Sequence, residues 1–280
     1  MNLFINKDTK PMLSSHRGGA ITNPESTLKA YKDTVNYGVK LIESDLHLTK
    51  DNVLVLSHDE TVDRLTDVQI KDDKKVHYIK DYTLLELKSF NFGYNYFDGK
   101  SYPYKNITRE RIEKEGLSIT TLDELFYLFK DNKEMLFIFD IKESGERGFL
   151  SARLVYEIIS KYLGLIDRVI IGSFNEEVIN YLRLNYPDVK RGAGVKDVIR
   201  FIKPFTKDFD FYSLSIPSFY KYKGIKINLA KKRLIKKAHK YGIAIHFWTI
   251  NTEKEMRKLI KLNPDAIMTD DLKLYNLVIK

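Results

Sequence analysis

The stretch VKLIESDLHLTKDNVLVLSHD, residues 39–59, combines a strand that carries two acids, a short turn, and a second apolar run that ends at a histidine. Side chains alternate along a strand, so Glu43 and Asp45 share one face near its carboxyl end. Two carboxylates this close repel each other unless one is protonated or a cation lies between them. Oxygen ligands suit a hard divalent ion such as Mg²⁺ or Ca²⁺, and His58 adds a group that titrates near neutral pH. The pattern is short, however, and two solvated acids on a surface hairpin would fit it equally well.

Outward from this stretch, strand and helix patterns alternate along the chain. Upstream, an apolar run near residue 13 leads into HRGG, and a helix with proline in its first turn follows as far as Tyr37. Downstream, the alternation resumes at Thr121. Strands are expected near residues 13, 42, 138, 170, 191, 213, 246 and 267. The later helices are expected at Leu122–Lys130, Phe149–Leu163, Glu176–Asn185, Lys196–Phe201 and Glu253–Lys261.

Eight strands separated by helices favour a parallel sheet, and eight is the number that closes a barrel. An open doubly wound sheet would instead carry a G-x-G-x-x-G loop after its first strand, which HRGG is not. The sequence therefore predicts a (β/α)8 TIM barrel that forms one domain over residues 1–280.

The alternation is interrupted between residues 47 and 120. This segment includes DRLTD at 63–67, a helical pattern at Thr83–Phe90 and the aromatic, turn-rich FNFGYNYFDGKSYPYKN. Aromatic side chains mixed with turn residues favour a structured excursion over a disordered linker. We therefore expect residues 47–120 to form an insertion after the second barrel strand.

Composition limits the class of protein. At 280 residues with 43% apolar content, the chain can bury a large core. It has no cysteine, which excludes disulfides and a cysteine nucleophile and fits a reducing compartment. No window reaches membrane-spanning length, and the first residues, MNLFINKDTKPML, lack the pattern of a signal peptide. We expect a soluble, cytoplasmic protein.

The formal charge of +9 is unevenly distributed. Residues 221–240 contain nine Lys or Arg and no acid. Apolar residues at helical spacing, among them Leu234, Ile235 and Ala238, indicate an outer helix with a solvated basic face. That interpretation is favoured over a surface for membrane lipids or nucleic acid, although the charge can attract an anionic substrate.

A barrel gathers its chemistry at the carboxyl ends of its strands, and polar residues of this chain occur there. The candidates are His16 and Arg17 after the first strand, Glu43 and Asp45 on the second, His58 beyond it, Asp140 and Lys142 on the third, and His246 and Trp248 on the seventh. Remote positions that converge on one mouth favour a functional site over scattered surface charges.

Some of the ring side chains have structural alternatives. His246 lies between apolar neighbours and fits a hydrogen-bonded core histidine at least as well as a site group. Trp248, the only Trp, is expected to wall the substrate, with filling the barrel top as the alternative. His47 either lies at the mouth or caps its strand, and His77 and His239 are expected on the surface.

A series of short motifs extends from Leu13 to about Leu272: HRG, E-x-D with T-K-D, H-D, D-R-L-T-D, an acid-x-Lys strand, S-F near 173, W-T-x-N at 248–251 and T-D at 269. In this order they resemble the glycerophosphodiester phosphodiesterase family, whose members are (β/α)8 barrels with an insertion after strand 2. The chain departs from the family at three positions. Asp140 stands where Glu is usual, as in the distantly related sphingomyelinase D enzymes, and Ser26 and Thr120 replace an Asn or His and a Pro.

The resemblance implies roles for individual residues. These are acid–base catalysis by His16 and His58, phosphate contacts by Arg17 and Lys142, and coordination of one divalent cation, Mg²⁺ or Ca²⁺, by Glu43, Asp45 and Asp140. The expected reaction is hydrolysis of a glycerophosphodiester to glycerol 3-phosphate and an alcohol. The expected partner is this small-molecule substrate, with no nucleic acid, and peripheral membrane contact is not favoured.

Two alternatives stay open. One is the same chemistry on a lipid, of the lysophospholipase D or sphingomyelinase D type. A single membrane-facing surface formed by the aromatic segment Phe90–Tyr104 and the basic helix would support it. The other is a barrel that binds phosphodiesters without turnover, against which the intact set of histidines and acids argues.

Overall fold

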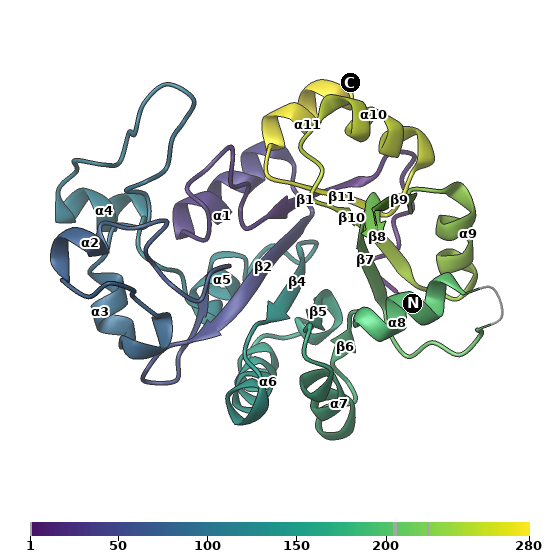
Figure 1. Cartoon of the computed structure of the whole chain (residues 1–280), viewed down its shortest axis with the longest axis horizontal. Helices are drawn as coiled ribbons and strands as arrows, with labels where there is room; N and C mark the ends of the chain where they lie inside the picture. The colour runs from purple at the N-terminus through teal and green to yellow at the C-terminus, as the bar shows by residue number, and fades with distance from the viewer. Residues whose placement is uncertain (1, 204–205, 223) are drawn as a thin grey trace.

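The computed structural model describes residues 2–203, 206–222 and 224–280. The main sheet has the strand order β6-β5-β4-β2-β1-β11-β10-β7, and every neighbouring pair in it is parallel. A parallel bridge between Gly192 and Ser213, just beyond β6, joins the two ends of this order and closes the ring. The predicted (β/α)8 barrel is thereby confirmed, and Figure 1 shows the strands surrounded by helices. The barrel strands are β1 Met12–His16, β2 Leu41–Leu48, β4 Leu136–Ile141, β5 Val169–Gly172, β6 Lys190–Arg191, β7 Ser213–Pro217, β10 Ala244–Trp248 and β11 Ala266–Thr269.

The outer helices follow the predicted pattern, and the helix at Glu176–Asn185 has the predicted ends while others are shifted. They are α1 Leu28–Thr34, α5 Leu122–Leu128, α6 Gly145–Ser160, α7 Glu176–Asn185, α8 Val195–Ile202, α9 Lys232–Lys240, α10 Glu253–Leu262 and α11 Leu272–Val278, with 3-10 turns η1 Val35–Tyr37 and η3 Ile166–Arg168. Helix α5 begins directly after Thr121 because the Thr121 hydroxyl and the Glu124 carboxylate form a capping box. Helix α6 begins four residues earlier than expected, at Gly145.

Strand alternation divides the core into an inner and an outer layer. Leu41, Leu136 and Ile138 point into the barrel, where Phe4 from the amino-terminal segment packs with them and is fully buried. Their neighbours along the strands, such as Phe137, point outward against the helices. Apolar side chains therefore fill part of the barrel interior, and Glu43, Asp45 and Asp140 lie beyond them toward the carboxyl ends of β2 and β4.

Between β2 and α5 the chain makes an excursion that has its own small core. Strand β3, Leu54–Leu56, pairs antiparallel with the end of β2. The segments that follow are α2 Val68–Lys71, η2 Ile79–Asp81, α3 Leu84–Lys88 and α4 Arg109–Glu115. Side chains that include Val62, Tyr82 and Phe92 form a separate buried cluster there. In Figure 1 the helices α2, α3 and α4 stand together on one side of the barrel.

The basic segment 221–240 differs from the prediction, because only its second half is a helix. Strands β8 Phe219–Tyr222 and β9 Ile225–Asn228 form an antiparallel hairpin, and α9 begins at Lys232. Gly224 has a φ of 80°, a conformation that favours glycine in a tight turn. Lys223, which was part of the predicted helix, lies outside the described residues. The helical spacing of the second half does not apply to the first half, where Gly224 permits the tight turn of a hairpin.

Within the described ranges, no helix has the length and apolar character needed to cross a lipid bilayer.

Candidate active site

The carboxyl ends of β2 and β4 lie side by side, which brings three of the predicted site residues together. Asp45 is paired with Asp140 in the sheet register, and Lys142 follows at the end of β4. The Lys142 ammonium lies 2.6 Å from Asp45 Oδ1 and 2.7 Å from Asp140 Oδ2. Asp45 is only 3% exposed, so this ion-pair cluster is largely shielded from water.

His16, at the end of β1, is held by the aspartate that follows the last barrel strand. Its Nδ1 lies 2.6 Å from Asp270 Oδ1, and its Nε2 lies 3.9 Å from Glu43 Oε2. Asn251 donates a hydrogen bond to the other Asp270 oxygen at 2.6 Å. Burial disfavours the charged imidazolium, but the charge of Glu43 and the hydrogen bond to Asp270 outweigh it and raise the pKa of His16. Because an ionised Asp270 can only accept, Nδ1 carries the proton and Nε2 is left for chemistry.

His58 has a similar arrangement of partners. Its Nδ1 lies 2.7 Å from Asp59 Oδ1, and Arg64 donates from Nε to the other oxygen of Asp59 at 2.6 Å. The hydrogen bond from His58, together with Arg64, holds the pKa of Asp59 well below its usual range. The His58 side chain is 40% exposed, so its free nitrogen is open to a ligand.

Arg17 lies between the carboxylates of Asp45 and Glu25. Its Nε lies 3.3 Å from Asp45 Oδ2, without hydrogen-bond geometry, and its Nη1 lies 3.5 Å from Glu25 Oε1. Glu25 in turn accepts a bidentate pair from Arg64 at 2.8 and 2.9 Å. Charges of alternating sign therefore run from Asp45 through Arg17, Glu25 and Arg64 to the partner of His58.

The turn after β1 needs special backbone conformations to place Arg17. Arg17 adopts a left-handed φ of 55°, and Gly18 follows with a φ of 84°. A Cβ at Gly18 would lie 2.7 Å from the Cβ of Ala30 in α1, which is closer than two carbon atoms can approach. Glycine at this position thus permits both the turn and the close packing of the helix.

The pKa values of two acids on β2 and β4 are raised. Burial, and then the charge of Asp45, raises the pKa of Glu43 to about 8. Burial also raises the pKa of Asp140, against the effect of Lys142. One oxygen of Glu43 and one of Asp45 are buried without a hydrogen-bond partner. Unpaired buried carboxylate oxygens are the donors that a hard divalent cation prefers, so the donor chemistry fits Mg²⁺ or Ca²⁺.

Glu43, Asp45 and Asp140 are not arranged as the ligands of a metal ion in this structure. Within the described residues, no three His, Asp or Glu side chains are grouped as they would be around a metal ion. The Lys142 ammonium lies between Asp45 and Asp140 and neutralises them instead. Binding a cation at these acids would therefore require the Lys142 side chain to move.

The remaining rings at the mouth take different positions. Trp248 is half-buried at the end of β10, where it is paired with Pro217 of β7. His246 is fully buried two residues earlier, and burial lowers its pKa to about 4, as expected for the core alternative. His47 bridges the end of β2 to the site, because its Nε2 lies 3.3 Å from the His58 carbonyl oxygen and its Nδ1 lies 3.2 Å from Glu143.

The expectation that His77 lies on the surface is wrong. His77 is fully buried in the excursion, and its Nδ1 lies 2.6 Å from Asp63 Oδ1. The charged partner offsets the cost of burying the imidazole. His239 is exposed, as expected.

Five residues that received no role from the sequence complete the site: Glu25, Asp59, Arg64, Asn251 and Asp270. The last four belong to the H-D, D-R-L-T-D, W-T-x-N and T-D motifs. The motif positions were therefore a signal, but the pairing of these residues with particular histidines was not visible in the chain order.

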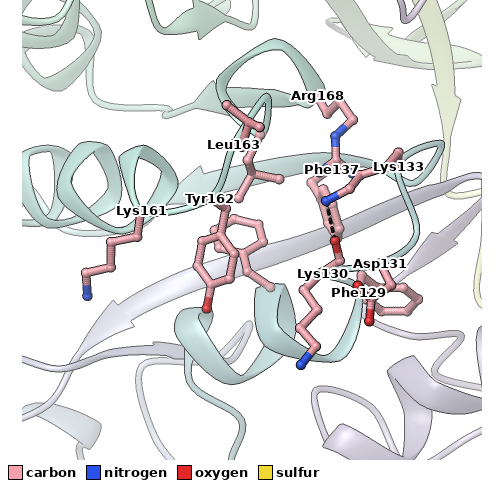
Figure 2. A pocket seen from close by; sticks show the side chains of 11 residues that line it. Phe129, Lys130, Asp131, Lys133, Phe137, Lys161, Tyr162, Leu163 and Arg168 are labelled. Atoms are coloured by element: carbon pink, nitrogen blue, oxygen red, sulfur yellow. Dashed lines mark hydrogen bonds between the residues drawn. The ribbon is translucent and has the colours of Figure 1, made fainter.

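A separate hollow of about 230 Å³ lies away from this constellation, and Figure 2 shows its lining. Its residues come from the ends of α5 and α6 and from the start of β4, which is the amino end of the barrel strands. The charged ends of Lys130 and Lys161 extend away from each other (Figure 2). Two other bases of the lining are bonded to backbone carbonyl oxygens, Lys133 to that of Lys130 and Arg168 to those of Asn132 and Met135.

Comparisons with known proteins agree with this geometry. The family described as "Glycerophosphoryl diester phosphodiesterase family" matches residues 16–274. A glycerophosphodiester phosphodiesterase of Caldanaerobacter subterraneus is 31% identical over 274 residues, which cover 97% of this chain and 99% of that protein. A lysophospholipase D of Mus musculus is 24% identical, with 91% and 82% of the two chains covered.

Solved structures share the fold. A glycerophosphoryl diester phosphodiesterase-like protein of Silicibacter pomeroyi has a TM-score of 0.74 at 17% identity, covering 99% of this chain and 95% of that one. A phosphodiesterase of Oleispira antarctica, solved in complex with the product sn-glycerol-3-phosphate, has a TM-score of 0.69 at 20% identity, with 96% and 97% covered.

Proposed function

The chain belongs to the glycerophosphoryl diester phosphodiesterase family, and from this premise we propose that it hydrolyses glycerophosphodiesters to glycerol 3-phosphate and an alcohol. The observation that carries the proposal is the pair of histidines, each with Nδ1 bonded to an aspartate, together with a cluster of acids and bases. Such a cluster suits a phosphodiester, whose anionic oxygens repel a nucleophile until their charge is neutralised.

Charge neutralisation is assigned to the centre of the site. Arg17 and Lys142 would bind the phosphate oxygens, with the planar guanidinium suited to a bidentate contact. Glu43, Asp45 and Asp140 would hold one divalent cation, Mg²⁺ or Ca²⁺, which supplies positive charge to the phosphoryl oxygens when bound. When the phosphate binds Lys142, the ammonium would leave the two aspartates, and their oxygens would become available to the cation.

Proton transfer is assigned to the histidines. His16 would remove the proton of the attacking oxygen, which is either the glycerol 2-hydroxyl, giving a cyclic phosphate that water then opens, or a water molecule. His58 would give a proton to the oxygen of the leaving alcohol as its bond to phosphorus breaks. Asp270 and Asp59 keep the two rings oriented with Nε2 free, which is what a general acid–base pair needs. Trp248 would wall the substrate at the mouth.

The segment 47–120 would act as an insertion within one catalytic domain, since it supplies His58 and Arg64. The cytoplasm, a reducing compartment, remains the proposed location for this cysteine-free chain.

The test is to add glycerophosphocholine with Mg²⁺ or Ca²⁺ and to measure glycerol 3-phosphate with and without a chelator. Release that the chelator stops is the expected result. A His58→Ala variant should lose turnover by about 10²–10⁴-fold while it stays folded. Full activity of this variant would remove His58 from the mechanism.

A lipid phosphodiester is the second candidate substrate. The similarity to a lysophospholipase D favours it, and so does Asp140, which the sphingomyelinase D resemblance also carries. Release of headgroup from a lysophospholipid, without release from glycerophosphocholine, would favour this candidate. Binding of either compound without any turnover would favour a barrel that only binds phosphodiesters.

A further inference from the structure

The positive charge of the protein is concentrated in one sector of the barrel. Residues 190–240 contain 15 Lys or Arg and 3 Asp or Glu, a net charge of +12. The rest of the chain contains the other 32 bases and 35 acids, a net charge of −3. The overall charge of +9 therefore belongs entirely to the part of the molecule from β6 to α9.

The elements of this sector are contiguous in space. Strands β6 and β7 meet through the bridge that closes the barrel, and α8, the β8–β9 hairpin and α9 follow them along the chain. Lys237 of α9 donates to the carbonyl oxygen of Lys203 at 2.8 Å, which ties α9 to the end of α8. The hairpin begins two residues after β7 ends at Pro217, so it rises from the rim that carries the active site. We refer to α8, the hairpin and α9 together as the basic sector.

The hairpin of the basic sector exposes both apolar side chains and lysines. Tyr220 and Ile227 are cross-strand partners and are 52% and 40% exposed. The next pair along the hairpin is Lys221 and Lys226, both exposed. Since successive side chains of a strand point to opposite faces, the hairpin has an apolar patch on one face and two lysines on the other.

Helix α8 repeats this combination. Val195, Ile199 and Ile202, spaced four and three residues apart, are 53%, 53% and 45% exposed, whereas Phe201 is fully buried. The helix thus presents a second apolar stripe to solvent in addition to the one that packs on the barrel. Exposed Lys196 flanks this stripe.

The combination of exposed apolar side chains and concentrated positive charge favours some classes of partner over others. A nucleic acid would use the charge but offers no apolar phase for the isoleucines and the tyrosine. A phospholipid surface uses both, because apolar groups enter the boundary between headgroups and acyl chains while bases bind the anionic headgroups. We propose that the basic sector docks the protein onto anionic phospholipid membranes.

This docking surface differs from the one considered from the sequence. Figure 1 shows α9 and the helices of the excursion on opposite sides of the barrel, so the excursion does not lie beside α9. In the proposed docking surface, the hairpin and α8 accompany α9 in place of the aromatic segment. Membrane contact, which the sequence disfavoured, becomes the better interpretation because the segment 219–228 is an exposed hairpin and not a continuation of the helix.

The test is co-sedimentation with lipid vesicles, which measures binding without turnover and is therefore independent of the proposed activity. Vesicles of phosphatidylcholine alone are compared with vesicles that contain phosphatidylglycerol as well. The expected result is binding to the anionic vesicles only, and binding that weakens as salt is added. Each lysine near an anionic surface contributes about a fivefold factor in partitioning, so Lys232→Gln with Lys236→Gln should lower it about 25-fold.

Variants with matched controls distinguish docking through the basic sector from nonspecific binding to vesicles. Tyr220→Ser with Ile227→Ser should lose vesicle binding but keep the hydrolysis of soluble glycerophosphocholine. The control pairs are Ile70→Ser with Leu85→Ser for exposed apolar groups and Lys75→Gln with Lys100→Gln for exposed bases, all in the excursion. Both should bind vesicles as the natural chain does, and all variants are checked by circular dichroism.

Three results would overturn the proposal. One is failure of the natural chain to bind the anionic vesicles. Another is equal loss of binding in the excursion controls and in the basic-sector variants. A third is binding to an oligonucleotide, unaffected by the Tyr220 and Ile227 substitutions, in place of the vesicles, which would assign the charge to nucleic acid.

Discussion

The two histidines at the mouth are held in similar ways but in different surroundings. His16 is bonded to Asp270 and its side chain is only 13% exposed, whereas His58 is bonded to Asp59 and is 40% exposed. In the proposed mechanism, the buried ring abstracts a proton next to the phosphate, and the exposed one delivers a proton to a departing alcohol. The carboxylates behind the rings are thus the residues to test first.

Replacement of Asp270 by Asn should lower kcat and shift the pH profile. Asp270 contributes to the raised pKa of His16, so its removal lowers that pKa. A general base works when neutral, that is, above its pKa, so the acidic limb of kcat/KM should move to lower pH. The amide can also favour the wrong tautomer, and a loss of up to about 10⁴-fold in kcat is expected.

The control for this variant is Asp271→Asn. Asp271 caps α11 through the Leu274 N–H, and Asn is an equally good cap, so this change should leave the profile in place. An unshifted acidic limb in Asp270→Asn would show that His16 does not act as the base in the measured range.

Arg64 should behave as a positioning residue for His58. It fixes Asp59 through Nε and Glu25 through both terminal nitrogens. We expect Arg64→Gln to reduce kcat by about 10–100-fold, the range for groups that orient a catalytic side chain, with a smaller effect on KM. Steady-state kinetics with glycerophosphocholine measures the separation of kcat from KM.

Arg111→Gln is the matched control, since Arg111 forms an exposed pair with Glu115 in the same excursion. Exposed pairs of this kind contribute about 0–1 kcal/mol and no geometry to the site. If the two variants lose activity to the same degree, the excursion has only a general structural role.

At the scale of elements, the β1–α1 turn and the excursion converge on the same carboxylate. Glu25 precedes α1, and Arg64 lies in the excursion after β3, yet they form the bidentate pair that holds His58 in place. The turn is possible because Gly18 lies against Ala30 of α1. The geometry of the proposed site therefore depends on how closely a helix can approach a strand end.

Gly18→Ala should be more damaging than a glycine substitution with the same backbone strain. Gly18 and Gly38 both have left-handed φ values, 84° and 71°, but only at Gly18 would a Cβ meet another atom within 4 Å. The φ strain costs about 1–2 kcal/mol at either position. The clash adds to it at Gly18 and displaces Arg17, so this variant should lose activity as well as stability.

The measurement is denaturant unfolding of Gly18→Ala and Gly38→Ala, together with turnover of glycerophosphocholine. Gly38→Ala should keep its activity, because it lies at the far end of α1 from the site. Equal unfolding free energies and equal activities in the two variants would contradict the packing argument.

At the scale of the whole molecule, barrel closure collects charges that would otherwise repel. Glu43 and Asp45 come from β2, Asp140 from β4 and Asp270 from the residue after β11. In this structure, Arg17 and Lys142 supply positive charge that offsets these negative charges. A cation that binds only the folded chain should therefore raise the stability of the entire barrel.

Addition of Mg²⁺ or Ca²⁺ should raise the thermal unfolding midpoint. At one hundred times the dissociation constant the gain is about 2.7 kcal/mol. The gain should disappear in a Glu43→Gln with Asp45→Asn variant and persist in Asp131→Asn with Glu134→Gln, which alters exposed acids elsewhere. An equal rise in both variants would place the cation outside the proposed site.

The sequence by itself determined the barrel and the identity of the groups at its mouth. Strand alternation is a local property, so the pattern around residues 39–59 fixed that Glu43 and Asp45 face the same way before any tertiary contact was known. The helix at Glu176–Asn185 was predicted with the bounds that the structure has, for the same reason.

Only the tertiary structure decided which groups are partners. His16 and Asp270 are 254 residues apart, and Glu25 and Arg64 are 39 apart, so closure of the ring and the path of the excursion had to bring them together. The burial of His77 and the exposure of the hairpin at 219–228 depend in the same way on neighbouring elements that the local sequence does not contain. A periodic pattern records which face of an element is apolar, but the contacts of a polar side chain are set by whatever segment packs against it.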